Sequence, residues 1–227
     1  MKTYIIIGGS KGIGNAILET LAVDNKVINI SRSTPNLDHE NLSHFNCDVL
    51  TEELPEVETA DGLIYCPGSI NLKPINRLKI DDFKADFEIN VIGAVKAIQK
   101  YLPILKNGIK PSIVLFSTVA SKLGMPYHAS IATAKSGVEG LVKSLGAELA
   151  PAIRINAIAP TVTDTELASK LLRNEKMKEN ITERHPLKKY LKPKEVAEMA
   201  AFLLSEKASA MSGQIFQMDC GIVSFKL

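Results

Sequence analysis

Three side chains that can carry a proton lie close together in the segment 126-PYHASIATAK-135: Tyr127, His128 and Lys135. Lys135 lies on an otherwise apolar face of the helix pattern that begins here. Because an apolar surrounding disfavours a lysine, its presence at this position indicates a functional contact. An acid-base group must lie within hydrogen-bond reach of its substrate and have a pKa near the working pH. The segment is therefore a candidate for acid-base chemistry.

A glycine-rich loop, 8-GGSKGIG-14, lies between the first apolar run and the first helix pattern. Glycine permits the backbone angles of a tight strand-to-helix turn and leaves bare backbone for a pyrophosphate at the helix N-terminus. In this context the loop predicts a dinucleotide site rather than a plain turn. The residues predicted to contact the cofactor here are Gly8, Ser10, Lys11, Gly12, Ile13 and Gly14.

The end of the second apolar run predicts which dinucleotide is preferred. An acidic residue about 20 positions after the glycines holds the ribose of NAD, whereas an arginine accommodates the 2′-phosphate of NADP. Residues 25–37 contain no Asp or Glu, Arg32 lies within that range, and Lys11 in the glycine loop supplies a second cation. We therefore expect NADP(H) to be preferred over NAD(H).

The elements that must position these residues alternate along the chain. Four patterns with helical spacing cover 13–23, 80–106, 130–149 and, with breaks near two prolines, 164–205. The predicted strands are 4–7, 27–30, 43–49, 62–66, 112–117, 153–159 and 214–218. This alternation is typical of parallel sheets with right-handed crossovers. We predict an α/β fold: a single doubly wound Rossmann domain over 1–227, with a parallel sheet of about seven strands and helices on both faces.

The composition narrows the possible partners. The 227 residues carry a net charge of +2 from 27 basic and 25 acidic side chains, with no basic block, which argues against nucleic acid or a membrane surface as partner. The three cysteines form neither a metal-binding pattern nor a disulfide framework. No apolar run is long enough to cross a bilayer. We expect a cytoplasmic protein that holds no metal and acts on a small molecule.

Motifs spread over the whole chain resemble those of the short-chain dehydrogenase/reductase family. The glycines of the loop match T-G-x-x-x-G-x-G, and 89-INVIGA-94, Lys135 and 219-DCG-221 fall at further family motifs. The resemblance implies that Asp48 and Val49 contact the adenine and that Gly68, Pro160, Thr163 and Thr165 contribute to cofactor binding. It also implies catalytic roles for Asn90, Thr118 and Lys135, of which Asn90 and Lys135 also contact the cofactor.

The tyrosine that donates the proton in this family is replaced here by Ile131. Tyr127 lies about one helical turn earlier and would point the same way if the helix began that early. His128 lies seven residues before Lys135, a spacing that resembles the Y-x6-K pattern of enoyl-thioester reductases. The helix also resembles that of dienoyl-CoA reductases, which lack this tyrosine. Further departures are 65-YCPG-68 after the fourth strand and Thr161 in a glycine position.

Two classes of function stay open at this stage. One is an NADP(H)-dependent oxidoreductase that acts on a ketone, an aldehyde or a 3-oxoacyl-like carbonyl, or alternatively on an enoyl or dienoyl thioester. The other is a catalytically silent NADP-binding sensor or partner subunit. The resemblance further implies a lid over about 165–192 and a homodimer or homotetramer. His39, His44 and His185 have no partner pattern and are interpreted as structural or solvated.

Overall fold

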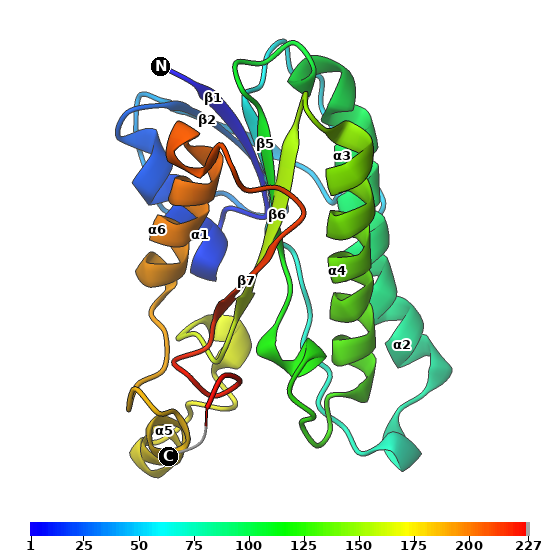
Figure 1. The fold of residues 1–227 in the computed structure, drawn as a ribbon, viewed down its shortest axis with the longest axis vertical. Coiled ribbons are helices and arrows are strands. Elements are labelled where there is room, and N and C mark those ends of the chain that lie inside the picture. The colour runs from blue at the N-terminus through cyan, green and yellow to red at the C-terminus, as the bar shows by residue number, and fades with distance from the viewer. Residues whose placement is uncertain (226–227) are drawn as a thin grey trace.

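A seven-stranded parallel sheet forms the centre of the computed structural model, which describes residues 1–225 (Figure 1). The strands are β1 (Thr3–Ile7), β2 (Lys26–Ser31), β3 (Leu42–Asn46), β4 (Gly62–Tyr65), β5 (Ser112–Phe116), β6 (Arg154–Pro160) and β7 (Ile215–Met218). Their order in the sheet is β3-β2-β1-β4-β5-β6-β7. The order reverses between β1 and β4, and ligands of doubly wound sheets bind at such a reversal, beyond the carboxyl ends of the strands.

Helices cover both faces of the sheet, as the sequence predicts (Figure 1). The helices are α1 (Gly12–Ala22), α2 (Ile80–Phe87), α3 (Gly93–Leu105), α4 (Ala129–Leu149), α5 (Glu175–Arg184) and α6 (Pro193–Leu204). Side chains of α1 and α6 pack in one apolar core, and those of α3 and α4 pack in the core on the opposite face. Because both faces are covered, β1, β4 and β5 carry almost uninterrupted runs of buried side chains.

The long helix predicted over 80–106 is interrupted by a π-helical turn, Glu88–Ile92, between α2 and α3. The hydroxyl of Tyr65 at the end of β4 donates to the Ile89 carbonyl at 2.7 Å and so satisfies a backbone group in the widened turn. Such turns are frequent at functional sites. This π-helical turn contains Asn90 and therefore determines the orientation of the Asn90 side chain relative to the sheet.

The segment expected to form a lid is less helical than its sequence pattern indicates. It contains a short 3₁₀ turn, Glu166–Ala168, followed by irregular backbone and then α5. Backbone hydrogen bonds between Leu191 and both Val162 and Asp164 join the two ends of the segment. Ala168, Leu172 and Ile181 form a small apolar cluster of its own. The lid is therefore a closed loop with its own core, attached to the domain at the end of β6.

Three predicted boundaries change. Strand β3 ends at Asn46, so the predicted adenine contacts lie in the loop after it. Strand β6 includes Pro160, which the sequence analysis placed after the strand. Helix α4 begins at Ala129, so Tyr127 and His128 both lie before the helix. Within residues 1–225, no helix combines the length and the apolar character needed to cross a membrane.

Candidate functional site

A cleft of about 700 Å³ lies beyond the carboxyl ends of the central strands. Its walls come from the loops after β1, β2, β3 and β4, together with the start of the lid. The predicted cofactor residues that line it are Gly8, Ser10, Lys11, Gly12, Ile13, Gly14, Arg32, Asp48, Val49, Gly68 and Thr165. Topology thus brings residues from four separate loops to one cleft at the reversal of strand order.

The glycine loop has the backbone geometry that a phosphate site needs. Gly8 and Gly12 have φ values of +79° and +54°, in the region that glycine adopts without strain. A Cβ at Gly14 would lie 2.2 Å from the Gly8 carbonyl oxygen, so no larger residue fits there. The N-terminus of α1 therefore faces the cleft through bare backbone, and its free N–H groups and helix dipole favour an anion.

Two cationic side chains border this cleft, and each forms an exposed ion pair. Lys11 forms an ion pair with Glu166 of the lid at 2.8 Å, and both side chains are mainly exposed. Arg32 lies 3.9 Å from Asp48, and 75% of its side chain is exposed. Exposed pairs of this kind contribute little to stability, so both cations can exchange partners for a phosphate.

A second, smaller cavity of about 190 Å³ adjoins the first and shares Ile13, Gly68 and Thr165 with it. Its other predicted site residues are Thr118, His128, Lys135, Pro160 and Thr163, and Ile131 also lines it. Apolar side chains complete the walls: Ile70, Phe116, Val119, Met125, Val162, Leu167, Ala168 and Leu171. Two of these, Leu167 and Leu171, belong to the segment expected to form a lid. The cavity therefore suits an uncharged, mainly apolar molecule with one polar group.

Lys135 lies almost buried in α4, with 9% of its surface exposed. Its Nζ donates to the Phe116 carbonyl oxygen at 2.8 Å. Burial lowers the pKa of Lys135 to about 8, and the charges of Cys66 and Asp86 oppose that shift. The ammonium group therefore has a lowered pKa and lies in the inner cavity, beside Gly68, which lines both cavities.

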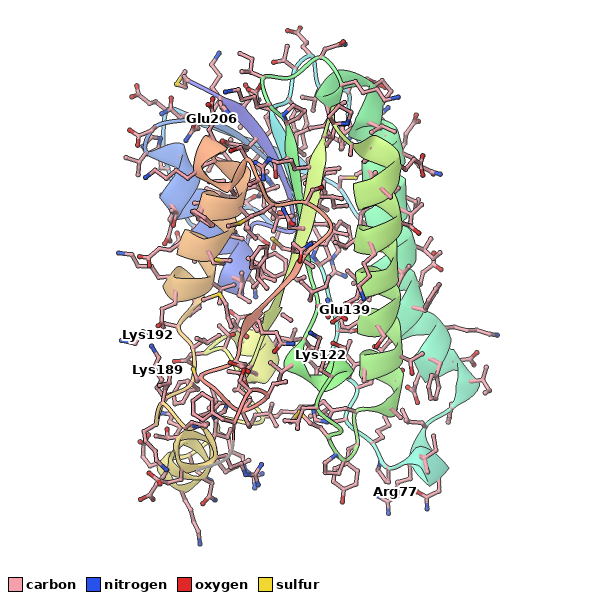
Figure 2. All side chains as sticks on the ribbon, in the orientation of Figure 1. Arg77, Lys122, Glu139, Lys189, Lys192 and Glu206 are labelled. Atoms are coloured by element: carbon pink, nitrogen blue, oxygen red, sulfur yellow. The ribbon has the colours of Figure 1, made fainter. Side chains whose placement is uncertain are left out.

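Of the two neighbouring hydroxyls after β5, Thr118 is the one left free for a ligand. The Ser117 hydroxyl donates to Glu139 at 2.7 Å, and Glu139 lies on the face of α4 turned towards the sheet (Figure 2). The Thr118 oxygen accepts a 3.3 Å hydrogen bond from the Ala120 N–H. This bond fixes the side chain and leaves its hydroxyl hydrogen available to a substrate oxygen in the cavity.

Asn90 lies behind the cavity wall rather than in it. Its amide nitrogen donates to the Asp86 carbonyl at 2.7 Å and to the Ser69 hydroxyl at 3.2 Å, whereas its buried Oδ1 has no hydrogen-bond partner within the described residues. A Cβ at Gly68 would lie 3.2 Å from this oxygen and 3.5 Å from Lys135 Nζ. The bare Gly68 thus leaves a polar recess between Asn90 and Lys135.

The two titratable residues before α4 lie in different environments. Tyr127 has a φ of +70° and is 58% exposed. It lines an outer depression that shares Met125 and His128 with the inner cavity but does not line the inner cavity itself. Because α4 begins only at Ala129, Tyr127 does not occupy the preceding helical turn that would place it above Ile131. His128 does line the inner cavity, and its Nδ1 donates to the Pro126 carbonyl at 2.8 Å.

Two features of the site went unrecognised in the sequence. Asp86 is fully buried and accepts hydrogen bonds from Ser69, from Asn71 at 2.9 Å and from Ser130 at 2.6 Å. Its place four residues before Asn90, on the same helical face, was the available signal. The second is the partner of His185: the side chain is buried, in agreement with the structural one of its two interpretations, and it is bonded to Thr161 in the cavity wall.

Comparison with known proteins agrees with this architecture. A family model described as "Enoyl-(Acyl carrier protein) reductase" matches residues 45–223. The chain is 30% identical to an uncharacterized oxidoreductase, YmfI, of Bacillus subtilis, over 97% of this chain and 98% of that one. It is 36% identical to the 3-oxoacyl-[acyl-carrier-protein] reductase FabG of Thermotoga maritima, over 78% of this chain and 71% of that one.

Among solved structures, the chain is similar to "ElxO with NADP Bound", with a TM-score of 0.87 and 26% identity over 99% of this chain and all of that one. The sheet order, the glycine loop and these matches define a dinucleotide-binding oxidoreductase fold. The protein belongs to the short-chain dehydrogenase/reductase family.

Proposed function

We propose that this protein is an NADP(H)-dependent oxidoreductase that reduces the carbonyl group of a small, uncharged and mainly apolar substrate. The observation that carries the proposal is that two cavities meet at Gly68, one suited to a dinucleotide and one walled by apolar side chains, with Lys135 in the inner cavity beside that glycine. The bare glycine loop and the unpartnered Asn90 Oδ1 beside Gly68 fit a bound dinucleotide. The nicotinamide supplies the hydride when it is bound.

The residues around Ile131 have separate roles in the reduction of the carbonyl group. Thr118 donates its free hydroxyl hydrogen to the substrate oxygen, which orients the carbonyl and polarises it. The charge of Lys135 lies in the wall of the inner cavity and stabilises negative charge that develops on that oxygen. Ile131 contributes only apolar wall, since isoleucine has no proton to give.

We assign the proton donor to His128. Its Nδ1 is held by the Pro126 carbonyl, which leaves Nε2 as the nitrogen of the imidazolium that can release a proton. Proton transfer from Nε2 to the substrate oxygen leaves a neutral ring whose Nδ1 still donates to Pro126. Tyr127 is excluded from this assignment by its exposed position outside the cavity.

The preference for NADP(H) rests on Arg32 and Lys11. Both border the cleft, and neither is held by a buried partner. The Ser33 hydroxyl, which lies 3.0 Å from that of Ser10, adds a further donor at the same edge. The arginine side chain presents several hydrogen-bond donors that match the geometry of a phosphate. A carboxylate in its place would repel that phosphate.

The test is NADPH oxidation against a panel of apolar ketones and aldehydes, with Thr118→Val beside the wild-type protein. The variant keeps the shape of the side chain and removes only the hydroxyl. We expect its kcat to fall by about 100-fold, the size of a lost polar contact at a developing oxyanion. Equal turnover in the two proteins would refute the assigned site, and binding of NADPH without turnover on any substrate would favour a silent binding protein.

A second candidate is reduction of a conjugated enoyl or dienoyl thioester. Two observations favour it: Ile131 stands where the carbonyl reductases of the family carry tyrosine, and the matching family model is described as an enoyl reductase. The same panel distinguishes the two functions when it includes an enoyl thioester, since the product is then a saturated thioester rather than an alcohol.

A further inference from the structure

A series of hydrogen bonds leads from Thr165, which lines both cavities, to the lid helix α5. The Thr165 hydroxyl donates to the Thr163 carbonyl at 3.3 Å, and the Thr163 hydroxyl donates to the Thr161 carbonyl at 3.0 Å. The Thr161 hydroxyl lies 2.7 Å from Nε2 of His185, and Nδ1 of the same ring lies 2.7 Å from the Ile181 carbonyl in α5. The series therefore joins the wall of the inner cavity to the lid helix.

The direction of each bond follows from the chemistry of its atoms. A carbonyl oxygen only accepts, so the His185 nitrogen that faces Ile181 must carry the hydrogen. In the neutral ring Nε2 is then the acceptor, and the Thr161 hydroxyl donates to it. Thr161 and His185 are 7% and 2% exposed, so water cannot replace either partner without local opening.

The place of this bond in the lid makes it a positioning contact. Backbone bonds of Leu191 to Val162 and Asp164 join the two ends of the lid, and the Leu187 N–H donates to the Cys220 carbonyl at 3.1 Å. The rest of the lid packs mainly in its own small cluster, which contains Ile181. Figure 2 shows Lys189 and Lys192 on the exposed segment that returns from α5 to α6. The His185 side chain is thus a buried polar link between α5 and the cavity wall.

We propose that Thr161 and His185 form a latch that holds the lid helix α5 against the wall of the substrate cavity. Through the lid residues Leu167 and Leu171, which line that cavity, the latch determines how well the substrate is retained. Thr161, which stands in a glycine position of the family, supplies the hydroxyl. His185 of the lid segment accepts the hydrogen bond from it. The kinetic consequence of the latch rests on the proposed oxidoreductase function, whereas its structural consequence does not.

The test compares Thr161→Val with Thr161→Ser by hydrogen exchange of the full-length protein. Valine keeps the shape and removes the hydroxyl, which leaves His185 Nε2 without a partner, whereas serine keeps the bond. We expect amides of α5 to exchange about tenfold faster in the valine variant and at the wild-type rate in the serine variant, with β1 and β4 unchanged in both. Equal exchange of α5 in the valine variant and the wild type, or in the valine and serine variants, would overturn the latch.

A second pair of variants approaches the same bond from the histidine side. The amide of His185→Gln can reach Thr161, whereas that of His185→Asn reaches only the Ile181 side. The latch therefore predicts fast exchange of α5 in the asparagine variant and slow exchange in the glutamine variant, even if Thr161→Val fails to fold. The reverse order contradicts it.

The kinetic arm uses any carbonyl substrate that the wild type reduces. In Thr161→Val the KM for that substrate should rise about tenfold while the Kd for NADPH stays within about twofold, and Thr161→Ser should change neither. An unchanged KM overturns the role of the latch in substrate retention. If the wild type turns over no substrate at all, the proposed function fails, and the exchange experiment still decides whether the latch exists.

Discussion

Replacing Lys135 by methionine should stabilise the folded protein while it abolishes activity. Methionine fills the space of the lysine stem without its charge. Burial moves the pKa of Lys135 from an ordinary 10.5 to about 8, which corresponds to about 3 kcal/mol of unfavourable free energy for the folded state at neutral pH. Loss of the hydrogen bond to the Phe116 carbonyl offsets about 1 kcal/mol of that gain. The variant should therefore gain about 2 kcal/mol in the free energy of unfolding.

The pH dependence gives the sign of this effect. The folded state binds the Lys135 proton more weakly than the unfolded state does, so stability rises with pH wherever only the unfolded state keeps the proton. The penalty is full below about pH 8, diminishes between about 8 and 10.5, and is absent above that range. The difference in stability between Lys135→Met and the wild type should shrink through the same interval.

The assay is thermal and urea unfolding of both proteins from pH 6 to 10.5, without cofactor. At pH 7 the melting temperature of Lys135→Met should be about 4–8 °C higher than that of the wild type. Lys143→Met, at an exposed position of the same helix, is the matched control and should change stability by less than about 0.5 kcal/mol. A lower melting temperature for Lys135→Met, or a difference that does not vary with pH, would refute the reasoning.

Three further predictions test the cofactor site and the assembly. Arg32→Asp should lower the ratio of NADPH affinity to NADH affinity by at least about tenfold in titrations of both dinucleotides, because it replaces a phosphate donor by a repelling carboxylate; an unchanged ratio would contradict the assignment. Gly68→Ala should weaken NADPH binding in the same titration, since its Cβ would enter the recess 3.2 Å from Asn90 Oδ1 and 3.5 Å from Lys135 Nζ; full affinity would show that the recess takes no part. Light scattering at micromolar concentration should give the mass of two or four chains, and the mass of one chain would end the proposal of a homo-oligomer.

The sheet and the cofactor cleft could be predicted from the sequence because both depend on local patterns. Runs such as 4–7 and 112–117 are buried on both faces, and their short length and their β-branched or large apolar residues indicate strands without an alternating pattern. The glycine loop is a contiguous motif, and the reversal of strand order then fixes which loops it meets. Seven parallel strands were predicted, and seven are present in the described residues.

The inner cavity depends on side-chain geometry that no local pattern encodes. Helix α4 begins at Ala129, so Tyr127 lies outside the helix. Tyr127 also has a left-handed backbone conformation, and its side chain is turned outward. The bond between Thr161 and His185 joins residues 24 positions apart through a folded lid. Such contacts follow from tertiary packing, so a sequence pattern could mark the residues but could not pair them.

The central claim is that a proton donor other than tyrosine serves the cavity around Ile131. The most direct measurement is single-turnover NADPH oxidation with one carbonyl substrate by the wild type, His128→Gln and Tyr127→Phe. The account predicts that the rate falls by about 100-fold in His128→Gln, the contribution typical of a general acid, and stays unchanged in Tyr127→Phe. A fast His128→Gln variant, or a slow Tyr127→Phe variant, would contradict it.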